Sequence, residues 1–185
     1  MRYMQTGGFQ NNPYMRLTLG LTLVLLLAFT ATNFLLYFAK MDLSPASVIS
    51  YYNGNEEEFH PARSYQSMLE VTHGHFAMMA LVMLLLTHLA VFAPFRRSQK
   101  LALIVTAFLS ALLSEGSGWL VRFVDPEFAW LKVASFLALQ GSLLFLLGAL
   151  AVFLWMGHRR QKEMESSGLA GDTEEELAEE EAQLP

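Results

Sequence analysis

Long, mainly apolar runs dominate the chain, and the polar residues gather between them. The runs occupy residues 17–39, 68–92, 101–123 and 128–156. Each run is long enough to cross about 30 Å of hydrocarbon as an α-helix. No small-residue cleavage site follows the first run, so we interpret it as an uncleaved span rather than a signal peptide. The pattern predicts an all-α fold, an integral membrane four-helix bundle.

The segments outside these runs predict the domain organisation. Residues 15–158 form one transmembrane domain with an outer loop at 40–67, and residues 1–14 form a polar, mobile segment. Residues 159–185 form a cytoplasmic tail that is first basic and then acidic. Nine of the chain's 17 acidic residues lie at or beyond Glu163. Because so little apolar surface accompanies them, we expect the acidic C-terminal tail to be disordered.

Basic and acidic residues divide between the two ends of the predicted spans. Arg16, the 96–100 turn and the 159–162 segment place Lys and Arg residues on one side. The loops at 40–67 and 124–127 lie on the other side and carry clusters of acidic residues. Because short cytoplasmic loops are enriched in Lys and Arg, we predict that both termini are cytoplasmic, in a bacterial inner membrane.

The composition removes several classes of function. Apolar residues make up 54% of the chain, which fits a protein whose first partner is the lipid bilayer. There is no cysteine, which excludes disulfides, iron–sulfur clusters and covalently attached c-type haem. No basic patch is interleaved with aromatic residues, so we expect no nucleic-acid partner. Any metal must therefore bind to histidine, methionine, carboxylate or backbone oxygen.

Three histidines, His73, His75 and His88, lie in the run at 68–92. Ionisable side chains at membrane depth are costly, which makes each of them a candidate metal or cofactor ligand. At about 100° per residue, His73 and His88 are about 60° apart around a helix and can share a face toward the bundle. His75 is about 160° from His73 and points elsewhere, toward another helix or a partner subunit, unless unwinding at Gly74 returns it to the same site.

A polar layer is predicted in the outer half of the membrane. At 1.5 Å per residue, Glu115 lies roughly 12 Å from the outer end of its span, in the layer of His73 and His75. Arg122 shares a helical face with Glu115, and Asn33 lies late in the first span. We therefore predict an outer-leaflet site from these five residues, whereas the third histidine of the second span stands nearly alone in the inner half.

Other polar or small residues of the spans have structural interpretations. Ser114, Gly116 and Gly118 would let helices approach closely. Lys132 would extend its side chain to the membrane surface, and Gln140 would donate a hydrogen bond between helices. The methionines of the second span are interpreted as core residues: Met68, Met78, Met79 and Met83.

The histidine pattern and the four spans together suggest haem b. Membrane cytochromes hold this group between helices through histidine nitrogens, without cysteine. Through Thr72-His73-Gly74-His75 and Thr87-His88 on one helix, residues 15–158 resemble the four-helix membrane cytochromes b that anchor quinone-linked oxidoreductases. The resemblance implies a membrane electron-transfer subunit that exchanges electrons between the quinone pool and a partner redox protein.

The resemblance also implies roles for particular residues. His73 and His88 are separated by roughly 22 Å along the helix, which would place two haems in opposite leaflets, while one haem would use an outer-layer histidine. Arg122 would lie near the haem propionates, and Asn33 belongs to the same cofactor site. Glu115 would be the catalytic group, accepting a proton as a quinol is oxidised.

The second axial ligands have several possible sources. In these cytochromes a second helix supplies opposing histidines, but the spans at 17–39, 101–123 and 128–156 contain none. The missing ligands would come from His60, from His158, from a methionine, or from a homodimer partner or another redox subunit.

Two other functions fit parts of the pattern. His73, His75, Met78 and Met79 could form a copper-type site of a metal transport or assembly protein, with the Glu-rich segment 56–60 as a collecting loop. Alternatively, the chain could be a cofactor-free structural subunit whose polar layer fixes helix register and whose outer loop docks a larger complex.

Overall fold

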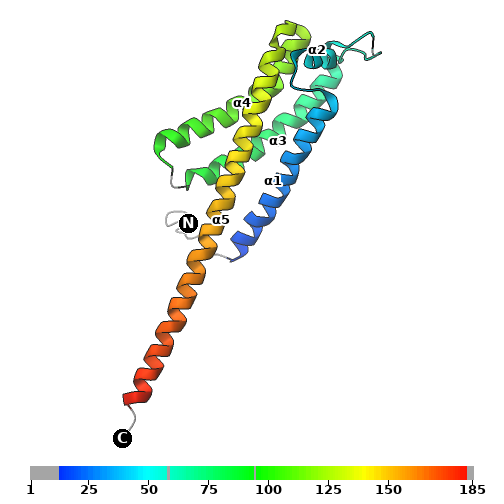
Figure 1. The fold of residues 1–185 in the computed structure, drawn as a ribbon. Coiled ribbons are helices and arrows are strands. Elements are labelled where there is room, and N and C mark those ends of the chain that lie inside the picture. Colours follow the sequence, from blue (N-terminus) through cyan, green and yellow to red (C-terminus); the bar gives the residue numbers. More distant parts are fainter. Residues whose placement is uncertain (1–12, 58, 94, 183–185) are drawn as a thin grey trace. The chain divides into compact units, whose positions relative to one another are not determined.

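The computed structural model describes residues 13–57, 59–93 and 95–182, with side chains up to Met156. These residues form α1 (Pro13–Lys40), α2 (Pro45–Asn53), α3 (Tyr65–Val91), α4 (Arg97–Phe123), the 3-10 helix η3 (Pro126–Phe128) and α5 (Ala129–Ala182) (Figure 1). Four helical segments are long and apolar enough to cross a membrane: Tyr14–Phe38, Tyr65–Val91, Arg97–Phe123 and Pro126–Met156. The prediction of an all-α membrane protein with four spans is confirmed.

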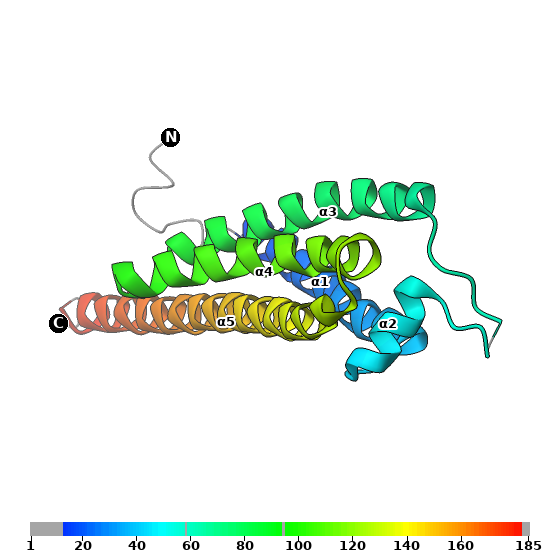
Figure 2. The same ribbon diagram turned by 90° about the horizontal axis from the view of Figure 1, so that it is seen from above.

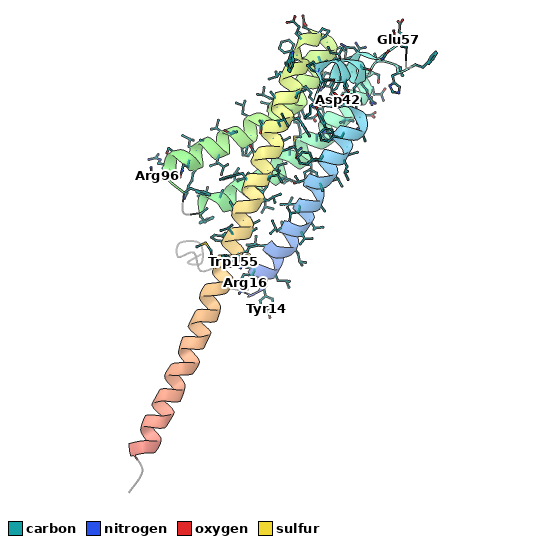
Figure 3. All side chains as sticks on the ribbon, viewed as in Figure 1. Tyr14, Arg16, Asp42, Glu57, Arg96 and Trp155 are labelled. Carbon is teal, nitrogen blue, oxygen red and sulfur yellow. The ribbon has the colours of Figure 1, made fainter. Side chains whose placement is uncertain are left out.

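The chain divides into two compact units. Residues 23–150 form one of them, which we call the bundle unit, and among the described residues 13–22 with 151–182 belong to the other. Tyr14, Arg16 and Trp155, labelled in Figure 3, belong to the second unit. All the site residues predicted within the spans belong to the bundle unit, so the site can be described within it.

The long loop predicted at 40–67 contains the short helix α2. Ser44 caps this helix by accepting a hydrogen bond from the Ser47 amide, and Pro45 occupies its first turn. The helix ends at Gly54, whose φ of 86° suits a residue without a Cβ atom. The hydropathy pattern did not predict α2 because nine residues are too few to give a clear helical period.

The helices α3 and α4 lie side by side and are joined by a short turn (Figure 2). The buried face of α4 consists mostly of small residues at helical spacing: Ala107, Ser110, Ala111, Ser114, Ser117, Gly118 and Val121. On this face Ser117 Oγ lies 3.5 Å from Ser135 Oγ of α5. Small side chains allow such close approach of helices, as predicted for Ser114 and Gly118, but Gly116 has open space around it.

A cluster of larger side chains joins the helices at the end of the bundle unit that carries α2, which we call the α2 end. The cluster contains Tyr37, Met41, Val48, Val121, Ala129, Val133 and Phe136. The rings of Tyr37 and Phe136 stack with their centroids 3.7 Å apart, and Phe34 meets Phe136 edge-on. Aromatic pairs of this kind contribute beyond the area they bury, so they add to the packing of the α2 end.

Three labelled charged residues mark the two ends of the bundle unit. Asp42 and Glu57 lie toward the α2 end, whereas Arg96 lies far from them, at the turn between α3 and α4 (Figure 3). Glu58 of the predicted collecting loop lies outside the described residues, as does most of the predicted mobile segment 1–14.

α5 continues as a helix to Ala182, so the described part of the acidic tail is helical. Alanine, leucine and glutamate have high intrinsic helix propensity, so a segment rich in them can continue an existing helix without apolar burial.

Candidate functional site

Glu115 of α4 is the centre of a hydrogen-bonded group between α3 and α4. Its side chain is only 11% exposed, and its Oε1 lies 2.6 Å from His75 Nδ1. Its Oε2 accepts a hydrogen bond from Thr72 Oγ1 at 3.3 Å, and Trp119 Nε1 donates to the same hydroxyl at 2.9 Å. A carboxylate at membrane depth is thus surrounded by donors.

Helical spacing explains why these four residues meet. Thr72 and His75 are three residues apart on α3, and Glu115 and Trp119 are four apart on α4. Residues at these separations share a helix face, and the two helices lie side by side. Each pair therefore presents its side chains to the other.

Lys132 of α5 adds a basic side chain next to this group, near Ser114 and Glu115 of α4. Its side chain is buried, with 7% exposure, and its Nζ donates a hydrogen bond to the Ser114 carbonyl oxygen. The charges of Lys132 and Glu115 attract each other. The interpretation of Lys132 as a residue that extends to the membrane surface is therefore wrong. A carbonyl and a nearby carboxylate inside the bundle provide partners for the ammonium group.

Tyr52 of α2 closes the site from the α2 end, and Gly118 makes room for it. A Cβ atom at Gly118 would lie 2.7 Å from Tyr52 Oη, so only glycine lets the phenol pack against α4 at this position. Burial raises the pKa of Tyr52, and the negative charge of Glu115 raises it further. The phenol therefore stays neutral, and its ring centroid lies 5.9 Å from Lys132 Nζ.

A cavity of about 260 Å³ lies beside these groups and is bordered by α1, α2, α3, α4 and α5. Polar residues on its wall include Asn33, Lys40, Tyr52, Arg63, Ser67, Thr72, His75, Ser114, Glu115, Trp119, Lys132 and Gln140. The remaining wall is apolar and includes Met68, Met78, Met79 and Met83, the methionines predicted as core. An apolar wall with a few convergent polar groups is typical of a small-molecule site.

Gln140 of α5 forms part of the same wall. Its side chain is 3% exposed, and its Oε1 has no hydrogen-bond partner within the described part of the chain. The sequence predicted this residue as a hydrogen-bond donor between helices, but the structure leaves its acceptor oxygen unpaired. Buried polar atoms of this kind are rare and costly, so the oxygen requires an explanation.

The structure brings together only some of the predicted site residues. Asn33, His75 and Glu115 all line the cavity. Arg122 does not, and its Nε instead donates to the Arg63 carbonyl oxygen at 3.0 Å. Since the Arg63 side chain reaches the cavity wall, Arg122 helps to hold that loop in place.

His73 and His88 lie away from the cavity, and both are exposed. The prediction that these two histidines share a face toward the bundle is wrong, because His75 is the histidine that faces α4. Helix geometry fixes the angles between residues but not which face a neighbouring helix covers. The contact of His75 with Glu115 identifies the face of α3 that packs against α4. The apolar residues of α3 alone do not identify it.

Five residues of the site were absent from the predicted cluster: Tyr52, Arg63, Thr72, Trp119 and Lys132. A signal existed for Thr72 and Trp119, because their spacing from His75 and Glu115 places each pair on one helix face. Tyr52 and Arg63 gave no such signal, since their positions depend on α2 and on the loop after it.

The residues present do not fit a haem held between two histidines of the bundle unit. Among the described residues His75 is the one histidine on the cavity wall. His60 is exposed and lies in the loop beyond α2. No group of three or more histidine, aspartate or glutamate side chains gathers in a metal-binding arrangement within the described residues. The copper-type site therefore also lacks support, because His73 points away from His75, Met78 and Met79.

Comparison with known proteins places the chain in a family. Residues 42–163 match the Aq_1264_TM family, which is described as a transmembrane helical domain. The match covers more than half of the chain and includes α2, α3, α4 and the spanning part of α5, so the chain belongs to this family. No curated protein and no solved structure matches it.

Proposed function

We propose that this member of the transmembrane helical domain family binds the headgroup of a lipid-soluble quinol beside Glu115, as the quinol-oxidising subunit of a membrane electron-transfer complex. The observation that carries the proposal is the 2.6 Å contact between Glu115 Oε1 and His75 Nδ1 on the wall of a cavity inside an apolar bundle. A quinol has an apolar ring and tail for such a wall, and hydroxyl groups for a carboxylate and an imidazole.

In the proposed reaction, the protons and the electrons of the quinol leave by different routes. Oxidation of a quinol to a quinone releases two protons and two electrons. Glu115 accepts one hydroxyl proton and passes it across the short contact to His75, which releases it, and Glu115 then accepts the second proton by the same route. The electrons pass to a partner redox protein of the same complex. Lys132 lies on the same cavity wall as Glu115, and it donates a hydrogen bond to the carbonyl oxygen of Ser114, the residue before Glu115.

The proton exit is proposed toward the α2 end. Half of the His75 side chain is exposed, with a value of 53%, and the cavity wall extends to Lys40 and Arg63 at that end. With both termini cytoplasmic, the α2 end faces outward from a bacterial inner membrane. Quinol oxidation would then release protons on the outer side.

Equilibrium binding to the full-length protein in lipid nanodiscs tests the proposal. The probe is a short-tailed quinol, kept reduced under anaerobic conditions and measured by equilibrium dialysis. We expect saturable binding to one site per chain. Because a hydrogen bond to a charged group contributes about 1.5–3 kcal/mol, Glu115→Gln should weaken binding roughly 10-fold to 100-fold. His75→Ala should weaken it in the same direction.

His73→Ala is the matched control, because His73 is two residues from His75 on the same helix but lies off the cavity wall. It should bind the quinol as the unchanged protein does. Absence of saturable binding would exclude the proposal, and so would equal weakening by His73→Ala and His75→Ala.

Haem b remains a second proposal, located at the exposed face of α3. His73 and His88 are both exposed there, and imidazoles that face lipid are costly unless another group covers them. Opposing ligands would have to come from a second copy or from the partner redox subunit. An absorption spectrum of the assembled complex tests this, with loss of the Soret band expected in His73→Ala or His88→Ala.

A further inference from the structure

Gln140 has no role in the proton transfer proposed above, but its position is suited to a contact with a ligand. It lies on the cavity wall, it is 3% exposed, and its Oε1 has no partner within the described residues. A ligand that donates a hydrogen bond to such an oxygen offsets the cost of burying it unpaired.

The depth of Gln140 below the turn between α4 and α5 can be compared with the depth of Glu115. A short turn that contains η3 joins α4 to α5, so depths on both helices can be counted from this turn. Glu115 is eight residues before the end of α4 at Phe123, which is roughly 12 Å. Gln140 is 11 residues after the start of α5 at Ala129, which is roughly 16 Å. Gln140 therefore lies roughly 4 Å deeper than Glu115, about three-quarters of a helical turn, which is of the order of the size of a six-membered ring.

The donors around Glu115 are engaged with protein acceptors. Trp119 Nε1 donates to Thr72, and Lys132 Nζ donates to the Ser114 carbonyl oxygen. By contrast, Glu115 and Gln140 both line the cavity with acceptor groups, and the amide oxygen of Gln140 is buried without a partner within the described residues. These two acceptors favour a ligand that donates a hydrogen bond to each of them.

We propose that Gln140 is a specificity-determining residue that accepts a hydrogen bond from the deeper hydroxyl of a para-dihydroxy aromatic ring. This inference rests on the proposed quinol site. With acceptors at both ends, the cavity binds the quinol more tightly than the quinone, whose two oxygens only accept hydrogen bonds. Oxidation replaces both donors by acceptors, which weakens the contacts and favours release of the product.

Three probes separate the two ends of the ligand: a short-tailed quinol, its mono-O-methyl ether and the corresponding quinone. Each is measured by anaerobic equilibrium dialysis against the full-length protein in nanodiscs. The quinol should bind most tightly, then the mono-ether, then the quinone. The ether retains one hydroxyl for Glu115 and loses the donor for Gln140. One neutral hydrogen bond of about 1 kcal/mol predicts roughly a 5-fold difference between quinol and ether.

The variant Gln140→Met removes the acceptor at nearly constant volume. It should erase the difference between quinol and mono-ether while leaving the affinity for the ether unchanged. The control is Leu143→Met, since Leu143 also lines the cavity and is buried but has no polar side-chain atom. This variant should keep the difference of roughly 5-fold.

Each alternative outcome is decisive. If the unchanged protein binds all three probes equally, or if Gln140→Met weakens all three by the same factor, then Gln140 does not select the ligand. Quinol binding that depends on His75, combined with no effect of Gln140→Met on the ratio, would leave the proposed function standing and exclude this inference. Absence of quinol binding would exclude both.

Discussion

The cavity face and the outward face of the same helices make different contacts, although the residues compared lie only one or two positions apart in the sequence. On α3, His75 contacts Glu115 and lines the cavity, whereas His73 does not line it, although both side chains are exposed. Both are histidines in an apolar span, and composition gives no reason to separate them. The difference teaches that, in a membrane bundle, the neighbouring helix assigns a polar residue its role.

The same contrast recurs on the other helices. On α4, Gly118 is packed against Tyr52, whereas a Cβ atom added at Gly116 would meet nothing within 4 Å. On α5, Phe136 is 5% exposed and stacked, whereas Leu137 is 49% exposed. Lipid is as apolar as the bundle interior, so the difference is one of packing and hydrogen bonding rather than of hydrophobic burial.

The largest expected effect is at Phe136. Phe136→Ala should lower the free energy of unfolding by about 3–5 kcal/mol, because it removes the ring that stacks on Tyr37 and leaves a cavity. Leu137→Ala changes a lipid-facing neighbour and should have a much smaller effect. Denaturant titration in mixed micelles measures both. Similar losses in the two variants would contradict the contrast between the faces.

Lys132 should have the next largest effect. Lys132→Met should destabilise the protein by about 1.5–3 kcal/mol, because the Ser114 carbonyl loses a charged donor and Glu115 loses a nearby positive charge. Lys100→Met removes the same charge, but from an exposed bond to the Val91 carbonyl, and should change stability by less than about 0.5 kcal/mol. The same micelle titration compares them, and equal effects would show that only net charge matters.

The glycine pair gives the smallest of the three effects on stability and the cleanest control. Gly118→Ala should cost about 1–2 kcal/mol, because its Cβ would overlap Tyr52 and force the phenol or α2 to move. Gly116→Ala adds the same methyl group in open space and should be neutral or slightly stabilising. Melting temperatures of the two variants, with Tyr52→Ala added to each, complete the test. Removal of the phenol should relieve the strain of Gly118→Ala and leave Gly116→Ala unaffected.

Part of the candidate site could be predicted from the sequence. Ionisable residues stand out in an apolar span, and depth counted from the span ends placed Asn33, His75 and Glu115 in one layer, all of which line the cavity. Depth also placed His73 in that layer, but the helix turns this residue outward. Depth along the helix axis therefore identifies the layer, but it does not distinguish the residues that line the cavity from those that do not.

The sequence by itself determined the all-α fold, the four spans and the polar layer, because hydrocarbon requires long apolar helices and makes every ionisable exception visible. Only the tertiary structure decided which histidine meets Glu115, that Lys132 turns inward and that Gln140 keeps an unpaired oxygen. The physical reason is that apolar residues surround each helix on all sides, so hydropathy does not mark the face that packs. That face is selected by small residues and hydrogen-bond partners on other helices.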